Sequence, residues 1–222
     1  LQEEIAGVQT VYHLAALISI DGDQKGMVQK INIEGVKNIC QAALQNKAKL
    51  VHVSSIHAFN QKSDFKDTMD ETFPQSTWEI NSAYDASKAQ GEEVVQSFIK
   101  KGLEATIVNP TGVIGPYDYN PSRMGQFFLD IYNGRFPALI QGGFDWVDVR
   151  DVIQAIIQAE KKGRCGEQYI LSNIPAWSNN ELFTLDVIHS DAISENLLIH
   201  NIYPNPFNPS TTIEFVILES SQ

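Results

Sequence analysis

Strand-like and helix-like segments alternate along the first half of this 222-residue chain. Short apolar runs at residues 8–14, 50–55 and 104–109 predict buried strands. Two longer segments with helical patterns, residues 26–45 and 84–101, separate them. This alternation is typical of β-α-β units, whose strands run parallel. We therefore expect an α/β fold with a doubly wound parallel sheet that binds ligands at the carboxyl ends of its strands.

The boundaries of these segments carry further signals. Gly102 follows the second helical segment, where a glycine commonly ends a helix, and Pro110 is expected to stop the third strand. The polar stretch 56–81 is unusually long for a loop in a compact domain, which favours a functional role. After residue 121 the pattern loosens. We expect a helix at 123–133, strand-like pieces at 138–140 and 146–149, a helix at 150–162 and a strand at 167–171.

Acidic residues outnumber basic ones by 27 to 16, so the net charge is −11. An acidic surface attracts neither nucleic acid nor an anionic membrane, and we expect neither as a partner. No apolar run is long enough to span a bilayer. The sequence therefore favours a protein that acts on a small molecule.

The cysteines and histidines show no metal-like spacing. Cys40 and Cys165 are far apart, which predicts two reduced thiols in a cytoplasmic setting, with a disulfide between them as the alternative. His13 and His52 lie within apolar runs, where a packed histidine is more common than a metal ligand. We expect no metal site.

Tyr84 and Lys88 are four residues apart, so a helix would place both side chains on one face. Ser55 lies upstream, at the end of a predicted strand. A nearby ammonium group and a cationic nicotinamide both favour phenolate, so the pKa of Tyr84 is expected to fall towards neutrality. The phenol could then serve as a general acid or base for carbonyl chemistry. The alternative for this spacing is a solvated helix face with an aromatic anchor.

Six stretches carry a resemblance to a known family. They are VYHLAA at 11–16, NIEG at 32–35, VHVSS at 51–55, YDASK at 84–88, NPTGVIGP at 109–116 and WVDVRDV at 146–152. In these stretches, and in their order, the chain resembles the extended short-chain dehydrogenase/reductase superfamily, also called the NAD-dependent epimerase/dehydratase family. It looks most like the dihydroflavonol-reductase-like branch, judged from residues 55–58, 115–118 and 142–146.

The resemblance implies NAD or NADP as cofactor and assigns catalytic roles. It makes Tyr84 the acid/base, Lys88 the group that lowers the Tyr84 pKa and binds the nicotinamide ribose, and Ser55 the holder of the substrate oxygen. Ser54 is the alternative to Ser55. Asn32 falls where the family has an Asn behind the site, with a helix-surface amide as the alternative.

Further contacts follow from the same resemblance. Besides Tyr84 and Lys88, the expected cofactor contacts are Leu14, Ala15, Ala16, Val53, Ser54, Pro110, Thr111, Gly112 and Val113. Candidate substrate contacts are His57, Tyr117, Asp118, Arg123, Trp146 and Arg150. Arg150 could bind a phosphate or carboxylate, and a structural ion pair with an acidic neighbour is equally consistent with its position.

Three functions remain open from the sequence. The first is an NAD(P)-dependent reductase or dehydrogenase, and the second is a nucleotide-sugar epimerase or dehydratase, favoured if Arg123 and Arg150 converge on a diphosphate. The third is a non-catalytic remnant or exported module. By resemblance, helix 84–101 is also a candidate surface for a homodimer.

The chain departs from the family pattern at its start. The family's first β-α-β unit carries a G-x-x-G-x-x-G turn that holds the cofactor pyrophosphate, and this sequence has no such motif. It enters the pattern at the expected fourth strand, which would leave residues 8–14 as a bare apolar edge. We expect residues 1–183 to be a truncated NAD(P)-binding domain, with its substrate-binding part mainly at 117–183, and cofactor contacts to be reduced accordingly.

The C-terminal tail has no place in this family. Residues 201–213 resemble the start of the sorting domain that directs proteins to type IX secretion, with a strand expected at 212–218. Residues 184–200 would be a joint, and 201–222 an incomplete sorting-domain-like tail. Because a cytoplasmic nicotinamide enzyme has little use for an export signal, we expect a fusion or assembly artefact. A proline-rich linker is the alternative.

Overall fold

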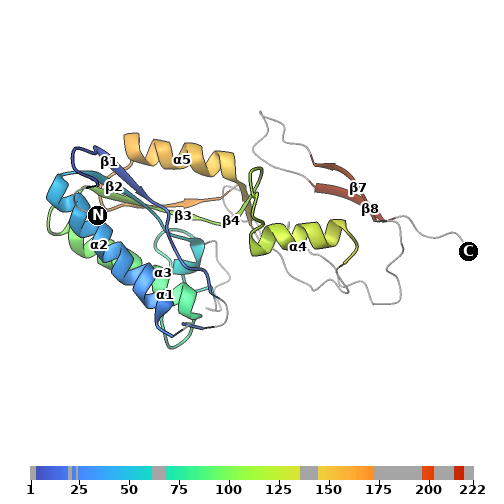
Figure 1. Cartoon of the computed structure of the whole chain (residues 1–222), viewed down its shortest axis with the longest axis horizontal. Helices are drawn as coiled ribbons and strands as arrows, with labels where there is room; N and C mark the ends of the chain where they lie inside the picture. The colour runs from blue at the N-terminus through green and yellow to red at the C-terminus, as the bar shows by residue number, and fades with distance from the viewer. Residues whose placement is uncertain are drawn as a thin grey trace, which may run out of the picture. The chain divides into compact units, whose positions relative to one another are not determined.

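The computed structural model describes residues 4–19, 22–23, 25–61, 69–135, 145–172, 197–202 and 213–217, the last two ranges by their backbone only. The chain divides into two compact units (Figure 1). The first contains Leu1–Thr111 and Asp151–Leu171, and the second contains Gly112–Arg150 and Ser172–Gln222. We describe each unit by itself.

A parallel sheet of four strands forms the centre of the first unit. In spatial order its strands are β1 (Thr10–His13), β2 (Lys49–Val53), β3 (Ala105–Pro110) and β6 (Gln168–Leu171). Every neighbouring pair in this sheet is parallel, and Val11 lies opposite Leu50 in the register of β1 and β2. The α/β class and the parallel sheet predicted from the alternating pattern are thereby confirmed.

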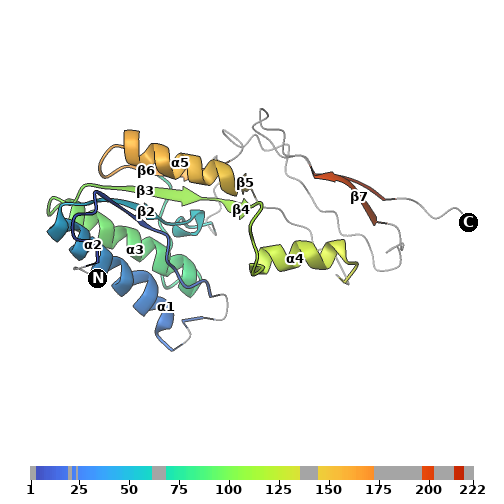
Figure 2. The same cartoon turned by 45° about the horizontal axis from the view of Figure 1, so that its top comes forward.

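Helices cover both faces of this sheet (Figure 2). They are α1 (Met27–Gln29), a π-helical turn (Lys30–Glu34), α2 (Gly35–Asn46), α3 (Ala83–Ile99) and α5 (Val149–Lys162). The first four lie on one face and α5 lies on the other. The segment 26–45, expected as one helix, is therefore continuous but changes its hydrogen-bond pattern at Lys30–Glu34.

The apolar core lies between the sheet and helices α2 and α3. Its buried members are Val36, Cys40, Ala43, Ala48, Leu50, Val95, Phe98, Leu103, Ala105 and Ile107. They come from α2, β2, α3 and β3 and from the turns that precede the two strands, so the two predicted helical segments and two of the predicted strands meet in one cluster. Cys40 is buried here and Cys165 is exposed, and both are free thiols.

Helix α3 is well defined at both ends. Ser82 caps its first turn by accepting a hydrogen bond from the Asp85 backbone N–H at 3.1 Å, and the Asp85 side chain accepts in return from the Ser82 N–H. At the other end Gly102 has φ +100°, a backbone angle that favours glycine. The predicted stop at Gly102 is confirmed.

Strand β1 lies at one edge of the sheet and β6 at the other. Tyr12 and Leu14, at the end of β1, are exposed apolar side chains. The expected apolar edge is therefore present in the described part of the chain. Pro110 does not stop β3 as expected but is its last residue, paired with Leu171.

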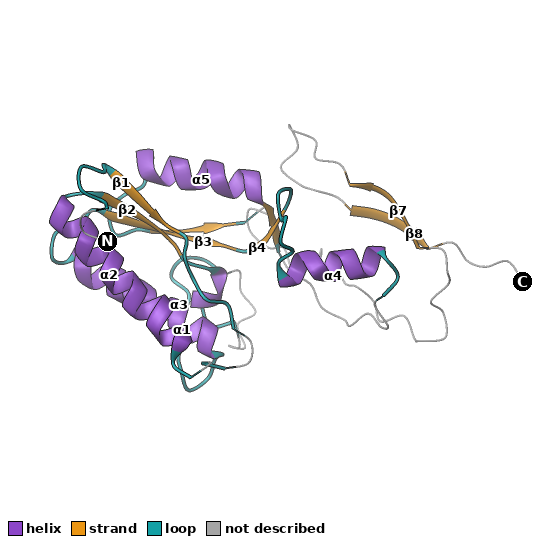
Figure 3. Cartoon of the chain, in the orientation of Figure 1, coloured by secondary structure: helices purple, strands orange, loops and turns teal. Residues whose placement is uncertain are grey.

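The second unit contains small elements only. Strand β4 (Gly112–Ile114) pairs in parallel with β5 (Trp146–Asp148), and α4 (Arg123–Tyr132) lies between them in sequence. An antiparallel pair, β7 (Leu197–Ile202) and β8 (Ile213–Ile217), completes the unit (Figure 3). Strand β8 matches the expected tail strand, whereas β4 and β7 were not predicted. The expected strand-like piece 138–140 and the proline-rich residues 203–212 lie outside the described residues.

Helix α5 and strand β6 belong mostly to the first unit, because β6 pairs with β3. Sequence analysis assigned them to the substrate-binding part. Among the described residues no helix combines the length and apolarity needed to cross a membrane.

Candidate active site

Ser55 and Tyr84 meet at the carboxyl end of β2. Ser55 follows that strand and caps a short 3-10 helix, η2 (Ile56–Ala58), by accepting a hydrogen bond from the His57 backbone N–H at 3.2 Å. Tyr84 lies in the first turn of α3, and its phenol shares a hydrogen bond with the Ser55 side chain. The two residues expected to hold and protonate a substrate oxygen are therefore adjacent.

Burial raises the pKa of Tyr84. The hydrogen bond with Ser55 opposes this shift, and the nearby Asp85 carboxylate adds to it. The expected fall of the Tyr84 pKa towards neutrality is wrong for the chain by itself, because Lys88 does not contribute to the shift. The phenol keeps its proton at neutral pH and is a hydrogen-bond donor.

Lys88 is buried and points at the end of β2. Only 5% of it is exposed, and its Nζ donates a hydrogen bond to the Val53 carbonyl oxygen at 3.1 Å. Burial lowers the pKa of Lys88 to about 8, and the negative charge of Glu92 opposes that shift. The shared helix face of Tyr84 and Lys88 is confirmed, but the ammonium group is held by the strand and not by the phenol.

Sequence analysis missed Glu92, which lies one helical turn beyond Lys88. The Glu92 carboxylate accepts hydrogen bonds from the Asn109 amide at 2.6 Å and from the Gln168 amide at 2.7 Å. Burial raises its pKa to about 7, against the lowering effect of these donors and of Lys88. The spacing of four residues from Lys88 on a buried helix face was the available signal.

Asn109 connects this carboxylate to Ser55. Its side-chain amide also donates to the Ser55 backbone carbonyl at 3.0 Å. Asn109 is fully buried at the end of β3, where sequence analysis placed it. A buried network thus runs from α3 through β3 to the end of β2.

His13 and His52 pack behind Lys88. Their Nδ1 atoms are 3.1 Å apart and their rings are stacked with centroids 5.3 Å apart. Burial, followed by the charge of Lys88, lowers the pKa of His13 to about 4 and that of His52 well below its ordinary value. Both are therefore neutral at physiological pH. The described residues contain no cluster of three or more His, Cys, Asp or Glu side chains arranged to hold a metal ion.

Asn32 positions the loop that follows β1. Its side-chain amide donates to the Leu17 carbonyl at 3.0 Å and to Ser87 Oγ at 2.9 Å, and its Oδ1 accepts from the Leu17 N–H at 2.7 Å. Asn32 is buried in the π-helical turn, so the helix-surface alternative is wrong. It acts on the loop backbone and on α3.

The expected cofactor contacts divide between the units. In the first unit Leu14, Ala15 and Ala16 are exposed at the end of β1, which leaves their backbone open to a ligand. The Val53 carbonyl binds Lys88, and Ser54 is buried beside Ser55. Pro110 ends β3 and the Thr111 N–H donates to the Leu171 carbonyl at 3.0 Å, whereas Gly112 and Val113 form β4 of the second unit.

Of the six candidate substrate contacts, His57 lies in the first unit with Tyr84. Its Nδ1 is 3.0 Å from an Asp85 carboxylate oxygen, and its ring packs edge-on against Tyr84 with centroids 5.7 Å apart. His57 is 41% exposed, so a ligand at Tyr84 could reach it.

The other five candidates, Tyr117, Asp118, Arg123, Trp146 and Arg150, lie in the second unit. The Arg150 guanidinium binds the Asp148 carboxylate through Nε and Nη2 at 2.8 and 2.5 Å, so the ion-pair alternative describes it. Asp118 accepts from the Ser122 N–H at 2.9 Å, and the Trp146 ring packs against Phe128. Tyr117 is exposed and has φ +76°, unusual for a residue with a side chain.

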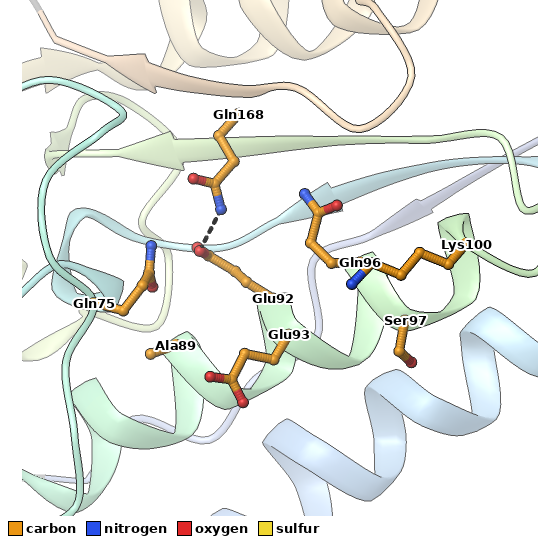
Figure 4. A pocket seen from close by; sticks show the side chains of 8 residues that line it. All are labelled: Gln75, Ala89, Glu92, Glu93, Gln96, Ser97, Lys100 and Gln168. Atoms are coloured by element: carbon orange, nitrogen blue, oxygen red, sulfur yellow. Dashed lines mark hydrogen bonds between the residues drawn. The ribbon is translucent and has the colours of Figure 1, made fainter.

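A shallow pocket of about 240 Å³ lies beside Glu92 (Figure 4). It is lined by Gln75, Ala89, Glu92, Glu93, Gln96, Ser97, Lys100 and Gln168. None of the residues predicted from the sequence lines it.

Comparison with known proteins identifies the family. A model of the NAD dependent epimerase/dehydratase family matches residues 1–174. The chain belongs to this family. Its α/β fold with a parallel sheet is thus that of a family member.

Two relatives and one solved structure show the range of this family. Sterol demethylase protein B of Methylococcus capsulatus is 34% identical over 174 residues, which are 78% of this chain and 52% of that protein. A candidate dihydroflavonol 4-reductase of Synechocystis is 29% identical, with the same shares of the two chains. A double mutant of DesIV, a dTDP-glucose 4,6-dehydratase of Streptomyces venezuelae solved with NAD bound, has a TM-score of 0.65 and 24% identity, covering 80% of this chain and 56% of that one.

The chain spans about half the length of the curated relatives it matches. The expectation that it corresponds to the later part of the family pattern agrees with this coverage. The similarity to a reductase relative also supports the branch named from the sequence.

Proposed function

We propose that this chain carries the reaction half of an NAD(P)-dependent oxidoreductase that transfers hydride to or from a carbinol or ketone carbon. The observation that carries the proposal is the Ser55–Tyr84 pair at the carboxyl end of β2, with the Lys88 ammonium group fixed one turn away. This edge of a parallel sheet is where doubly wound folds bind their ligands.

The side chains have separable roles in reduction. Tyr84, whose phenol keeps its proton because burial raises its pKa, donates that proton to the substrate oxygen as a general acid. Ser55 holds the same oxygen through its hydroxyl, since its backbone is fixed by Asn109. Lys88 supplies a positive charge beside the strand end. In the opposite direction Tyr84 accepts the hydroxyl proton.

The residues present fit the nicotinamide side of such a cofactor, which would supply the hydride when bound. Leu14, Ala15 and Ala16 offer open backbone at the end of β1, and Asn32 holds the following loop through Leu17. Asn109 Oδ1, a buried acceptor with no hydrogen-bond partner in the structure, lies near the end of β3. The glycine-rich turn for the pyrophosphate is not in the sequence.

A nucleotide-sugar epimerase or dehydratase is the second candidate. The 26% identity over 176 residues to a dTDP-glucose 4,6-dehydratase of Mycobacterium tuberculosis favours it. Arg150, the residue considered for a diphosphate, binds Asp148 instead. Turnover of a nucleotide sugar, with no net oxidation of added cofactor, would select this candidate over the reductase.

Replacement of Tyr84 by Phe tests the proposed role directly. The variant keeps the ring and removes the proton donor, so turnover by a version extended upstream to the start codon should fall by about 10²–10⁴-fold. Cofactor affinity should stay nearly constant. Tyr12→Phe, on the exposed edge strand, is the matched control and should retain turnover. An active Tyr84→Phe variant would contradict the proposal.

A further inference from the structure

Glu92 has no role in the reaction as described so far, yet it is among the most deeply buried groups of the chain. Only 2% of it is exposed, and its side chain contacts Asn109 of β3 and Gln168 of β6. An ionised carboxylate in such a place is costly unless it is paired and hydrogen-bonded. Its surroundings must therefore supply a countercharge and hydrogen-bond donors, and Lys88, Asn109 and Gln168 do so.

The contacts of Glu92 lead to the catalytic serine. One carboxylate oxygen accepts from the Asn109 amide at 2.6 Å, and the same amide donates to the Ser55 carbonyl at 3.0 Å. The second oxygen accepts from Gln168 at 2.7 Å, which holds the carboxylate from β6. The Asn109 amide can serve both Glu92 and Ser55 only when it presents its NH₂ group, which an ionised acceptor favours.

The charge of Glu92 acts on Lys88. It favours the ammonium form and opposes the effect of burial. The other titratable groups that face Lys88 from the sheet are His13 on β1 and His52 on β2, which are neutral at physiological pH. On the solvent side of Glu92, the pocket adds the exposed Glu93 and Lys100 (Figure 4).

We propose that Glu92 is a positioning residue of this site, which holds Ser55 in place through Asn109 and keeps Lys88 in its charged form. This inference rests on the proposed function for its consequence in catalysis. The geometry itself is independent of the reaction. Glu92 touches neither the expected substrate nor the cofactor, and it acts through two residues that do.

The pH dependence of turnover is the readout that a merely structural role would not move. With Glu92 titrating at about 7 and Lys88 at about 8, kcat/KM should be bell-shaped with limbs near these values. Glu92→Gln should remove the acid limb. It should also move the basic limb to lower pH, because the ammonium form loses its countercharge.

The same variant should lower kcat by about 100-fold with a smaller change in KM, since a misplaced serine affects the reacting geometry. Glu93→Gln is the matched control, because Glu93 is the next residue of α3, is exposed and lines the same pocket. It should leave both limbs in place. Unchanged limbs in Glu92→Gln would overturn the inference.

Gln168→Leu provides a second variant if Glu92→Gln does not fold. Loss of the Gln168 amide removes a donor that lowers the Glu92 pKa, so the acid limb should move to higher pH. An acid limb that stays in place would count against Glu92 as the titrating group.

Unfolding of the 222-residue chain by denaturant tests the Glu92 titration without turnover. The folded-state pKa of Glu92 is about 7 against an ordinary 4.5, so Glu92 contributes stability that is lost as pH rises across that interval. His13 and His52, whose pKa values are lowered by burial, contribute in the opposite direction below their ordinary pKa of 6.5. The free energy of unfolding of Glu92→Gln, taken relative to the parent chain, should therefore rise with pH across this interval, whereas that of Glu93→Gln should stay parallel to the parent. A Glu92→Gln curve parallel to the parent would overturn the inference, whereas turnover that survives Tyr84→Phe would instead overturn the proposed function.

Discussion

The two halves of helix α3 face the same sheet and bury opposite kinds of side chain. The first half buries Lys88 and Glu92 beside the half-buried Tyr84, whereas the second half buries Val95 and Phe98 in the apolar core. Burial shifts the pKa of Lys88 down and that of Glu92 up, which means that folding disfavours both charges. The apolar packing of the second half stabilises α3 against the sheet and offsets the free-energy cost of burying the two charged side chains of the first half.

The contacts that hold α3 in place therefore lie mostly outside the group of charged residues. The Val95–Phe98 half anchors α3 against Leu50 and Ile107, and the Ser82 cap fixes the first turn. Lys88 and Glu92 lie between these two anchored ends of α3, so the helix fixes their positions. Rigid elements hold catalytic groups more accurately than loops do.

Phe98→Ala should have the largest effect on stability. Phe98 is 3% exposed in the core cluster, and truncation of a buried Phe costs about 3–5 kcal/mol. Denaturant unfolding of the 222-residue chain measures the loss. Ile153→Ala, on the exposed side of α5, should change stability by less than about 1 kcal/mol. Equal losses in the two variants would contradict the role of the second half of α3 as part of the stabilising apolar core.

Gly91→Ala should have an intermediate effect, in the first half of α3 beside Glu92. A Cβ at Gly91 would lie 3.0 Å from the Asn32 carbonyl oxygen, so α3 must move away from the π-helical turn. We expect a loss of about 1–3 kcal/mol. Gly35→Ala is the matched control, since its Cβ would be 3.9 Å from the nearest atom and should stabilise the helix by about 0.5–1 kcal/mol. The same sign in both variants would show that the close helix contact is unimportant.

Ser82→Ala should have the smallest effect. It removes the cap from the N-terminal end of α3, which carries Tyr84 and Lys88, and should cost about 1 kcal/mol. Ser97→Ala, at an exposed position of the second half, should stay within about 0.5 kcal/mol of the parent chain. A Ser82→Ala variant as stable as Ser97→Ala would mean that the first half is held by its side-chain network and not by its cap.

Much of the fold could be predicted because the spacing of apolar residues and the glycines and prolines that end helices and strands are local signals. The strands at 8–14 and 50–55, and helix 84–101 with its stop at Gly102, lie close to the observed β1, β2 and α3. Strand β4 was missed because it follows β3 after a single residue. The π-helical turn gave no sequence signal, and it lies where α3 approaches the Asn32 carbonyl oxygen closely at Gly91.

The sequence predicted which residues come together at the candidate site better than it predicted their contacts and pKa shifts. The spacing of Tyr84 and Lys88 gave the shared helix face, but not the direction of a long lysine side chain, which Val53 and Glu92 determine from other elements. The sign of the Tyr84 pKa shift failed for the same reason, since burial depends on tertiary packing. The Glu92–Asn109–Ser55 network joins three segments and has no local signal beyond the spacing of Glu92 from Lys88.

Nicotinamide binding is the measurement that tests the central claim most directly. Fluorescence of NADH or NADPH would be titrated with this chain and with a version extended upstream to the start codon, each beside its Lys88→Met variant. The account predicts binding by the extended version and a loss of at least about tenfold in Lys88→Met, since a charged contact contributes about 1.5–3 kcal/mol. Binding that Lys88→Met leaves unchanged, or no binding by either version, would contradict it.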